Sequence, residues 1–373
     1  MAISKIDSDG IVSGGITADS LNIGQIGGRR NLIINGSQIV AQRGTSSTSG
    51  GFQTVDRFEF NASNGDQIAF TQSQSSESPD DFSNSYKIDV TTAETAIDAD
   101  DHFWLGTKLE AQDLQQLNYG TASAQSFTLS FYVRSALTGT YAVWFYSSDG
   151  NRSITSTYTI NTADTWERKT LTIVGDSSGT INNDNGVGFE IRWMLAAGSN
   201  YTSADSTSWG ADAANRRAYN HTAQWGTSAS HDFHITGVQL EVGSVATPFE
   251  HRSYGEELAL CQRYFHKHDT KNGGSYIFIG SGGTARSSTN ITGIIQYPLR
   301  MRSAPTLTST SITATRLLIA DNSTAVTGIV ADQIGVLQAA ISVTVSSGLT
   351  AGSYYMWLAW GSEAPSVNFD AEL

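Results

Sequence analysis

The sequence has only one cysteine, Cys261, so no disulfide can form within the chain. The fold must therefore be held together by side-chain packing or by assembly with other copies. Cys261 falls on an apolar stripe of a predicted helix. We interpret it as a small buried apolar residue and not as a reactive thiol.

Charged residues make up only 15% of the chain, against about 25% in typical globular proteins. Gly, Ser, Thr and Asn take their place, and only five prolines occur. This mixture is typical of many short strands joined by turns. The net charge of −13 and the lack of Lys/Arg clusters argue against a nucleic-acid partner.

The sequence as given also predicts no targeting or membrane segment. The opening MAISKIDSDG has no secretory apolar region, and no apolar run approaches the about 18 residues that span a bilayer. We therefore expect no membrane insertion and expect assembly in a cytoplasm.

The catalytic motifs that we looked for do not occur. There is no G-x-S-x-G elbow, since GTSAS at residues 226–230 lacks the closing glycine. There is also no H-E-x-x-H motif, P-loop or dinucleotide fingerprint. We predict no catalytic residues and no cofactor, and we expect that the protein is not an enzyme.

Three clusters have metal-ligand chemistry, and for each we favour ordinary surface or turn residues. Two clusters combine histidine and aspartate, and the third is an acidic turn with the chemistry of a structural Ca²⁺ site. The clusters are His231, Asp232 and His234; His266, His268 and Asp269; and Asp98, Asp100 and Asp101.

Period-two alternation of apolar and polar residues predicts an all-β fold from residue 31 onward. A short helix is expected at 109–117, and the absence of a helical repeat favours an antiparallel jelly roll or β-sandwich. The predicted strands are 31–35, 38–42, 55–60, 67–72, 85–90, 103–109, 127–134, 140–146, 154–160, 166–174, 187–193 and 233–242.

A helix is predicted at residues 253–265, with Ser253 as N-cap and Glu256 completing a capping box. Its apolar stripe either joins three copies or packs on its own domain. The sequence alone does not choose between these. The stripe, our candidate trimer interface, consists of Tyr254, Leu258, Cys261 and Phe265.

Residues 271–373 predict a second β domain. In SYYMWLAWG, aromatic residues occur on both strand faces, which indicates a strand buried on both sides. The predicted strands are 276–280, 292–297, 306–310, 317–320, 327–330, 338–345 and 353–361.

Residues 197–230 lack alternation and form a long loop that is rich in aromatic and polar residues. The aromatic rings either anchor the loop on the sandwich or a neighbouring subunit, which we favour, or stack on sugar rings beside polar groups. The candidate glycan-binding residues are Tyr201, Trp209, Asp212, Tyr219, Asn220 and Trp225.

Residues 1–28 contain evenly spaced apolar residues at a density too low for a core. A disordered tail is one interpretation, and we favour an arm that orders on docking to another protein. The candidate attachment residues are Ile3, Ile6, Ile11, Ile16 and Leu21.

Two motifs, RRNLIINGSQIVAQRGTS (29–46) and GVQLEVGSVATPFEHRSYGEELALCQRYF (237–265), resemble tail fibres and receptor-binding proteins of tailed bacteriophages. With LSFYVRS at 129–135, the resemblance covers residues 29–268. It implies a virion-attachment arm (1–28), a jelly-roll domain resembling carbohydrate-binding modules (29–250), a junction helix (251–270) and a β tip domain (271–373).

The resemblance further implies a homotrimeric fibre in the virion. Such a fibre docks through its N-terminus on a tail adaptor, a nozzle or another virion protein. It binds a host-surface receptor, which we expect to be a glycan. The alternatives are a virion-bound polysaccharide depolymerase and a capsid or tail decoration without a receptor.

Overall fold

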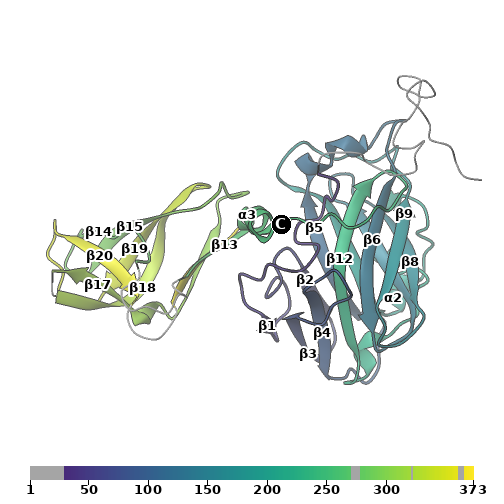
Figure 1. Cartoon of the computed structure of the whole chain (residues 1–373), viewed down its shortest axis with the longest axis horizontal. Coiled ribbons are helices and arrows are strands. Elements are labelled where there is room, and N and C mark those ends of the chain that lie inside the picture. The colour runs from purple at the N-terminus through teal and green to yellow at the C-terminus, as the bar shows by residue number, and fades with distance from the viewer. Residues whose placement is uncertain (1–28, 270–277, 321, 360–364) are drawn as a thin grey trace, which may run out of the picture. The chain divides into compact units, whose positions relative to one another are not determined.

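The computed structural model describes residues 29–269, 278–320, 322–359 and 365–373 (Figure 1). The chain divides into two compact units, with the boundary between Ser253 and Tyr254. We call these unit 1 and unit 2 and describe each by itself. The predicted attachment arm, with Ile3, Ile6, Ile11, Ile16 and Leu21, lies outside the described residues.

Unit 1 contains two six-stranded antiparallel sheets. The first, in spatial order, consists of β1 (Ser46–Ser47), β3 (Ala69–Ser75), β4 (Ser85–Thr92), β12 (Asp232–Val242), β6 (Phe127–Ser135) and β9 (Glu167–Ile173). The second consists of β11 (Gly210–Ala211), β8 (Arg152–Ile160), β7 (Gly139–Ser147), β10 (Val187–Ala197), β5 (His102–Glu110) and β2 (Glu59–Ser63). The prediction of an antiparallel β-sandwich is confirmed.

The core of unit 1 lies between these sheets, because alternate side chains of each strand point to the same side. In β6, Phe127, Leu129, Phe131 and Val133 are fully buried. The ring of Phe131 meets that of Trp193 from β10 edge-on, with 5.7 Å between ring centroids. Each such side chain contributes roughly 1.5–3 kcal/mol, so this core can hold the unit without a disulfide.

Strands β4 to β10 and β12 occupy segments where the sequence predicted strands, and the predicted short helix is the 3-10 helix η2 (Ala111–Leu117). The predicted strand 55–60 is displaced, because β2 begins only at Glu59. Arg57 has a backbone φ of 70°, which a strand does not allow.

The predicted strands 31–35 and 38–42 are wrong, since this part of the chain is irregular. Asn35 and Gln38 have positive φ angles of 59° and 61°. The Asn35 amide also replaces ladder hydrogen bonds, because its Nδ2 donates to the Val40 carbonyl at 2.9 Å and its Oδ1 accepts from the Val40 N–H at 3.0 Å.

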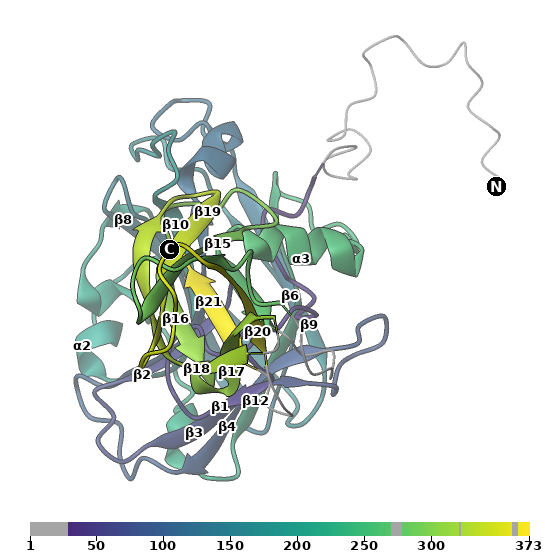
Figure 2. The same cartoon turned by 90° about the vertical axis from the view of Figure 1, so that its left-hand side faces the viewer.

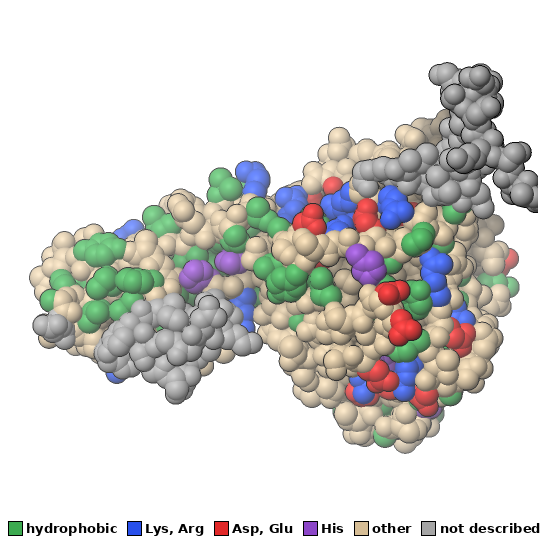
Figure 3. All heavy atoms as spheres, in the orientation of Figure 1, with side chains coloured by type: hydrophobic (Ala, Val, Ile, Leu, Met, Phe, Trp, Pro, Cys, Tyr) green, Lys and Arg blue, Asp and Glu red, His purple; other side chains and the backbone are tan. Residues whose placement is uncertain are grey.

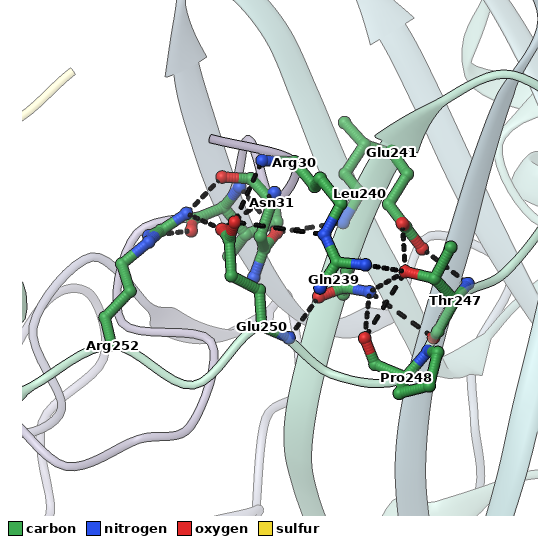
Figure 4. Close-up of polar contacts among 10 residues, drawn as sticks. Arg30, Asn31, Gln239, Leu240, Glu241, Thr247, Pro248, Glu250 and Arg252 are labelled. Atoms are coloured by element: carbon green, nitrogen blue, oxygen red, sulfur yellow. Dashed lines mark hydrogen bonds and ion pairs between the residues drawn. The ribbon is translucent and has the colours of Figure 1, made fainter. Parts of the chain in front are cut away.

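The two ends of unit 1 are joined by a polar clasp of Arg30, Asn31, Thr247, Glu250 and Arg252 (Figure 4). The Glu250 carboxylate accepts hydrogen bonds from the backbone N–H groups of Arg30 and Asn31, each at 3.1 Å. It also pairs with the Arg252 guanidinium at 2.9 Å, and the Arg30 guanidinium donates to the Thr247 hydroxyl at 3.0 Å. Burial raises the pKa of Glu250, but these donors together hold it below its ordinary value.

The clasp brings together the two motifs of the sequence that carry the family resemblance. Asn31 Oδ1 accepts the backbone N–H of Leu240 at 3.0 Å, and the Gly36 carbonyl accepts that of Val238 at 2.9 Å. A Cβ at Gly36 would lie 2.1 Å from the Val238 oxygen, so only glycine fits this approach. The motifs therefore encode the closure of the sandwich.

Unit 2 begins with the helix α3 (Tyr254–Gln262), and its other described elements are strands and the short 3-10 helix η5 (Ile312–Ala314) (Figure 2). A three-stranded sheet has the order β13 (Phe265–Asp269), β21 (Ser366–Asp370) and β16 (Thr306–Thr310). A six-stranded sheet has the order β14 (Gly283–Thr284), β20 (Tyr354–Ala359), β17 (Thr315–Ile319), β18 (Asn322–Ile334), β19 (Gln338–Val345) and β15 (Asn290–Gln296). The expectation of a second β unit is confirmed, and the first residues of predicted strand 276–280 lie outside the described residues.

The six-stranded sheet of unit 2 closes on itself, because residues 281–286 pair with β20 on one side and contact β15 on the other. Trp357 is fully buried inside, and its indole N–H donates to the Thr315 hydroxyl at 3.0 Å. Tyr354, at the start of β20, is 54% exposed. The expectation that this strand is buried on both faces is therefore wrong at Tyr354.

The helix α3 is shorter than the predicted helix 253–265. Phe265 pairs with Asp370 as the first residue of β13 and is not helical, because the edge of β21 supplies backbone partners. Cys261 and Phe265 are buried within the single chain, whereas Tyr254 is 57% exposed and Leu258 half-buried. The four residues therefore do not share one exposed face. In the described part of the chain, no helix has the length and apolar character to span a membrane.

Candidate functional site

The predicted loop after β10 is folded against the second sheet of unit 1. It contains α2 (Ser199–Thr202), β11, η3 (Ala214–Arg216) and η4 (Trp225–Thr227). The backbone N–H of Ala218 donates to the Tyr201 carbonyl at 2.9 Å, and that of Thr222 donates to the Thr140 carbonyl of β7 at 2.9 Å. These hydrogen bonds hold the loop in an ordered conformation over the second sheet, and we call this segment the cover.

Three of the predicted glycan-binding rings anchor this cover. Trp225 is fully buried, with its ring centroid 5.7 Å from that of Phe60. Trp209 donates its indole N–H to the Val174 carbonyl at 2.7 Å. Tyr201 is only 9% exposed and lies 4.3 Å from the His102 ring. Sugar contact is therefore wrong for Trp225 and for Tyr201, because burial in the fold occupies their ring faces.

Asp212 is also engaged inside the protein. Its carboxylate accepts the Trp144 indole N–H at 3.2 Å and pairs with the Arg217 guanidinium at 3.2 Å. Only 8% of its side chain is exposed. Asp212 therefore fixes the loop on β7, and its oxygens are not available to a ligand.

The remaining two predicted residues, Tyr219 and Asn220, line a pocket of about 220 Å³. Tyr219 is half-buried, and Asn220 is exposed. Asn220 has a φ of 61°, a left-handed conformation that asparagine tolerates. The other lining residues come from β8, from the end of β9 and from the loop: Ile154, Thr155, Ser156, Thr157, Thr172, Ile173, Val174 and Thr207.

The pocket exists because two sheet edges meet at this side of the sandwich. β9 is the last strand of the first sheet, and β8 pairs on its outer side only with the two-residue strand β11. Side chains between these edges are not covered by another strand. Six of the lining residues, Tyr219 included, carry hydroxyl groups and none is charged. The surface is therefore suited to a neutral, hydroxyl-rich ligand.

His221, which follows Asn220 in the sequence, links the loop to β7. Its ring is buried, and Nδ1 accepts the backbone N–H of Ala142 at 3.2 Å. Burial lowers the pKa of His221 from 6.5 to about 4, against the opposing effect of backbone hydrogen bonds. The ring is therefore neutral near pH 7, so Nδ1 remains an acceptor.

Ser85, His234 and Asp232 lie in the hydrogen-bond order of a catalytic triad. Ser85 Oγ is 3.1 Å from His234 Nδ1, and His234 Nε2 is 3.2 Å from Asp232 Oδ2. Ser85 and His234 are fully buried, and the Ser85 hydroxyl donates to the Glu77 carbonyl at 2.6 Å. Burial keeps a substrate away from Ser85, and the Ser85 proton points to the Glu77 carbonyl and not to the imidazole. The three residues therefore link β4 to β12.

The three clusters with metal-ligand chemistry, for which the sequence favoured ordinary surface or turn residues, can be located in the structure. Among the described residues, no group of three His, Cys, Asp or Glu side chains converges in the way that a metal ion requires. In the acidic turn, the backbone N–H of Asp98 donates to the Asp101 carboxylate at 2.8 Å. Burial raises the pKa of Asp101, and this hydrogen bond opposes the shift. In the other clusters, His231 lies 2.6 Å from the Trp225 carbonyl, and the His266 and His268 rings are 6.0 Å apart.

Comparisons with known proteins identify no family. No family model matches the chain, and no curated protein does. Solved structures with some similarity include the enzymatically active domain of bacteriophage CBA120 tailspike protein 4. It is 13% identical over 57% of this chain and 21% of that chain, with a TM-score of 0.32.

Two carbohydrate-binding modules are also similar to this chain. The family 11 module of Clostridium thermocellum, in complex with a mixed-linked tetrasaccharide, is 12% identical over 55% of this chain and 98% of its own, with a TM-score of 0.28. TmCBM61, in complex with β-1,4-galactotriose, is 10% identical over 57% of this chain and 99% of its own, also with a TM-score of 0.28. Scores this low support no assignment of function, which therefore depends on the chain's own residues.

The sequence reasoning missed the strand residues of the pocket. Thr155, Ser156 and Thr157 belong to β8, where ITSTYTI carries hydroxyl side chains on most positions. A central strand of a sandwich is usually more apolar. That composition is the signal that could have identified an open edge.

Proposed function

We propose that this chain is a tail fibre or receptor-binding protein of a tailed bacteriophage. In this proposal, several copies, three by the family resemblance, form a fibre in the virion. The fibre attaches through residues 1–28 to a tail adaptor, a nozzle or another virion protein and binds a host-surface glycan. The two motifs that resemble this family support the proposal, and their residues build the clasp of unit 1.

Glycan recognition by unit 1 is supported chiefly by the pocket of Tyr219 and Asn220. Its hydroxyl and amide groups match the donors and acceptors of a sugar, and the Tyr219 ring offers a flat apolar surface to sugar C–H groups. The volume of about 220 Å³ is below the roughly 300 Å³ at which drug-sized sites begin. The pocket therefore suits about one sugar ring of a longer chain.

Calorimetric titration of the full chain with purified envelope polysaccharide of a susceptible host tests this function. Tyr219→Ala should weaken binding at least tenfold, because the ring surface is lost. Asn220→Gly should also weaken binding, since it removes the amide but keeps the left-handed backbone. Tyr254→Ala is the matched control, because it removes an exposed tyrosine from unit 2.

Unchanged affinity in both pocket variants would exclude the pocket as the glycan site. No binding of wild type to any envelope fraction would instead favour a decoration role without a receptor. We further propose that the chain binds glycan without cleaving it, and the occluded Ser85 hydroxyl supports this. Incubation with the same polysaccharide should release no new reducing ends, whereas release would favour a depolymerase.

A further inference from the structure

The two units of the chain differ strongly in charge. Residues 1–253 contain 15 Lys and Arg against 27 Asp and Glu, whereas residues 254–373 contain 7 against 8. Nearly all of the net charge of −13 therefore belongs to unit 1. Two copies of the chain repel each other through unit 1, and unit 2 is the part that copies can bring together at little electrostatic cost.

One side of the closed sheet in unit 2 exposes apolar residues. Ile294 of β15 is 42% exposed and Val330 of β18 is 58% exposed. Ile294 pairs with Ala340 of β19, and Val330 pairs with Ser342 two residues further along the same strand. We call Ile294, Val330 and Ala340 the apolar face, beside which Ser342 is polar but uncharged. Leu337, 57% exposed, lies in the turn between β18 and β19, and Figure 3 shows apolar side chains among uncharged polar ones over unit 2.

Charged side chains are almost absent from the strands that carry this face. In β15, β18 and β19 the only charged residue is Asp332, and its carboxylate pairs with the Arg286 guanidinium at 3.2 Å. Two such faces can meet without opposing like charges. Depletion of charge around exposed aliphatic residues also distinguishes the centre of a protein interface from ordinary surface.

We propose that copies of this chain associate through the apolar face of unit 2. The partner is a second copy, because unit 2 is nearly neutral while unit 1 carries nearly all of the net charge, so two copies can meet through this face at little electrostatic cost. The stripe of α3 is less suited to this role, since Cys261 and Phe265 are buried within the chain. The inference rests on the proposed assembly of several copies and is independent of glycan binding.

Light scattering of the full chain after size-exclusion chromatography tests the inference. Wild type should have a mass that is a multiple of 39.9 kDa. Val330→Glu and Ile294→Glu, separately and combined, should shift the mass to that of one chain, because each places an unpaired charge in the contact. Gln116→Glu, at an exposed glutamine of unit 1 outside the pocket, adds the same charge elsewhere and should leave the mass unchanged.

Tyr254→Glu on α3 separates the two candidate interfaces. It should leave the mass unchanged, whereas dissociation by this variant alone would assign self-association to the helix and overturn the proposal. A wild type with the mass of one chain, or a double variant with the wild-type mass, would also overturn it. Circular dichroism should show that the variants remain folded. Glycan affinity per chain should persist in a dissociated variant, which keeps this test separate from that of the pocket.

Discussion

Acid should destabilise unit 1 through His221. The folded protein holds the pKa of this ring at about 4, whereas the unfolded chain has the ordinary value of 6.5. As the pH falls from 6.5 towards 4, the unfolded chain takes up a proton that the folded chain does not. Stability contributed by the neutral ring is therefore complete above pH 6.5 and is lost over this window.

The size of the effect follows from the two pKa values. Between pH 7 and pH 5 the unfolded ring becomes almost fully protonated while the folded ring stays mostly neutral. The free energy of unfolding should fall by about 2 kcal/mol from this group alone. Because other groups also titrate in this range, the measurement needs a variant that differs from wild type at His221 only.

His221→Asn supplies that variant, since its side-chain oxygen can accept the Ala142 N–H as Nδ1 does and it does not titrate. Urea unfolding, followed by tryptophan fluorescence, would be measured at pH 7 and pH 5 for both proteins. Wild type should lose about 2 kcal/mol more than the variant between the two pH values. Equal losses would refute the reasoning, because they would show that His221 does not titrate differently on folding.

Further predictions concern the clasp, the core and the thiol. Glu250→Gln should lower the free energy of unfolding of unit 1 by about 2 kcal/mol in urea, because hydrogen bonds to a charged acceptor are weakened; a change near zero would contradict this role. Gly36→Ala should cost about 1–3 kcal/mol in the same assay, as its Cβ would clash with the Val238 oxygen, and a neutral result would show that the backbone relaxes. Trp225→Ala should cost about 3–5 kcal/mol through the cavity it leaves, with a loss below 1 kcal/mol arguing against burial. Cys261 should react with a thiol reagent only after denaturant is added, because it is fully buried; rapid labelling of native protein would contradict its position.

The strands that could be predicted are those in which apolar and polar residues alternate, because this pattern marks a strand with one buried face. β6 is an example, since FTLSFYVRS places every second residue in the core. The segment around Asn35 could not be read in this way, because its side-chain amide replaces backbone pairing and local sequence does not show the partner. The strand β13 was missed for a related reason. The apolar spacing that marks α3 continues to Phe265, and only the distant partner strand β21 ends the helical pattern.

The roles of the loop aromatics were less predictable than the loop itself. Trp225 and Tyr219 belong to the same loop, yet Trp225 is in the core and Tyr219 lines a pocket. What separates them is the sheet order, which places the edges of β8 and β9 beside Tyr219. Periodicity reports which face of a strand is buried but not which strands end a sheet.

The clasp determines how unit 1 would carry mechanical load. Arg30 and Glu250 are in direct contact, so the chain enters and leaves this unit at one place. Tension applied at these two ends pulls on their mutual hydrogen bonds first and reaches the strands of the sandwich only after those bonds have separated. A pull transmitted along the chain through both ends of unit 1 would therefore open the clasp before it disturbed either sheet.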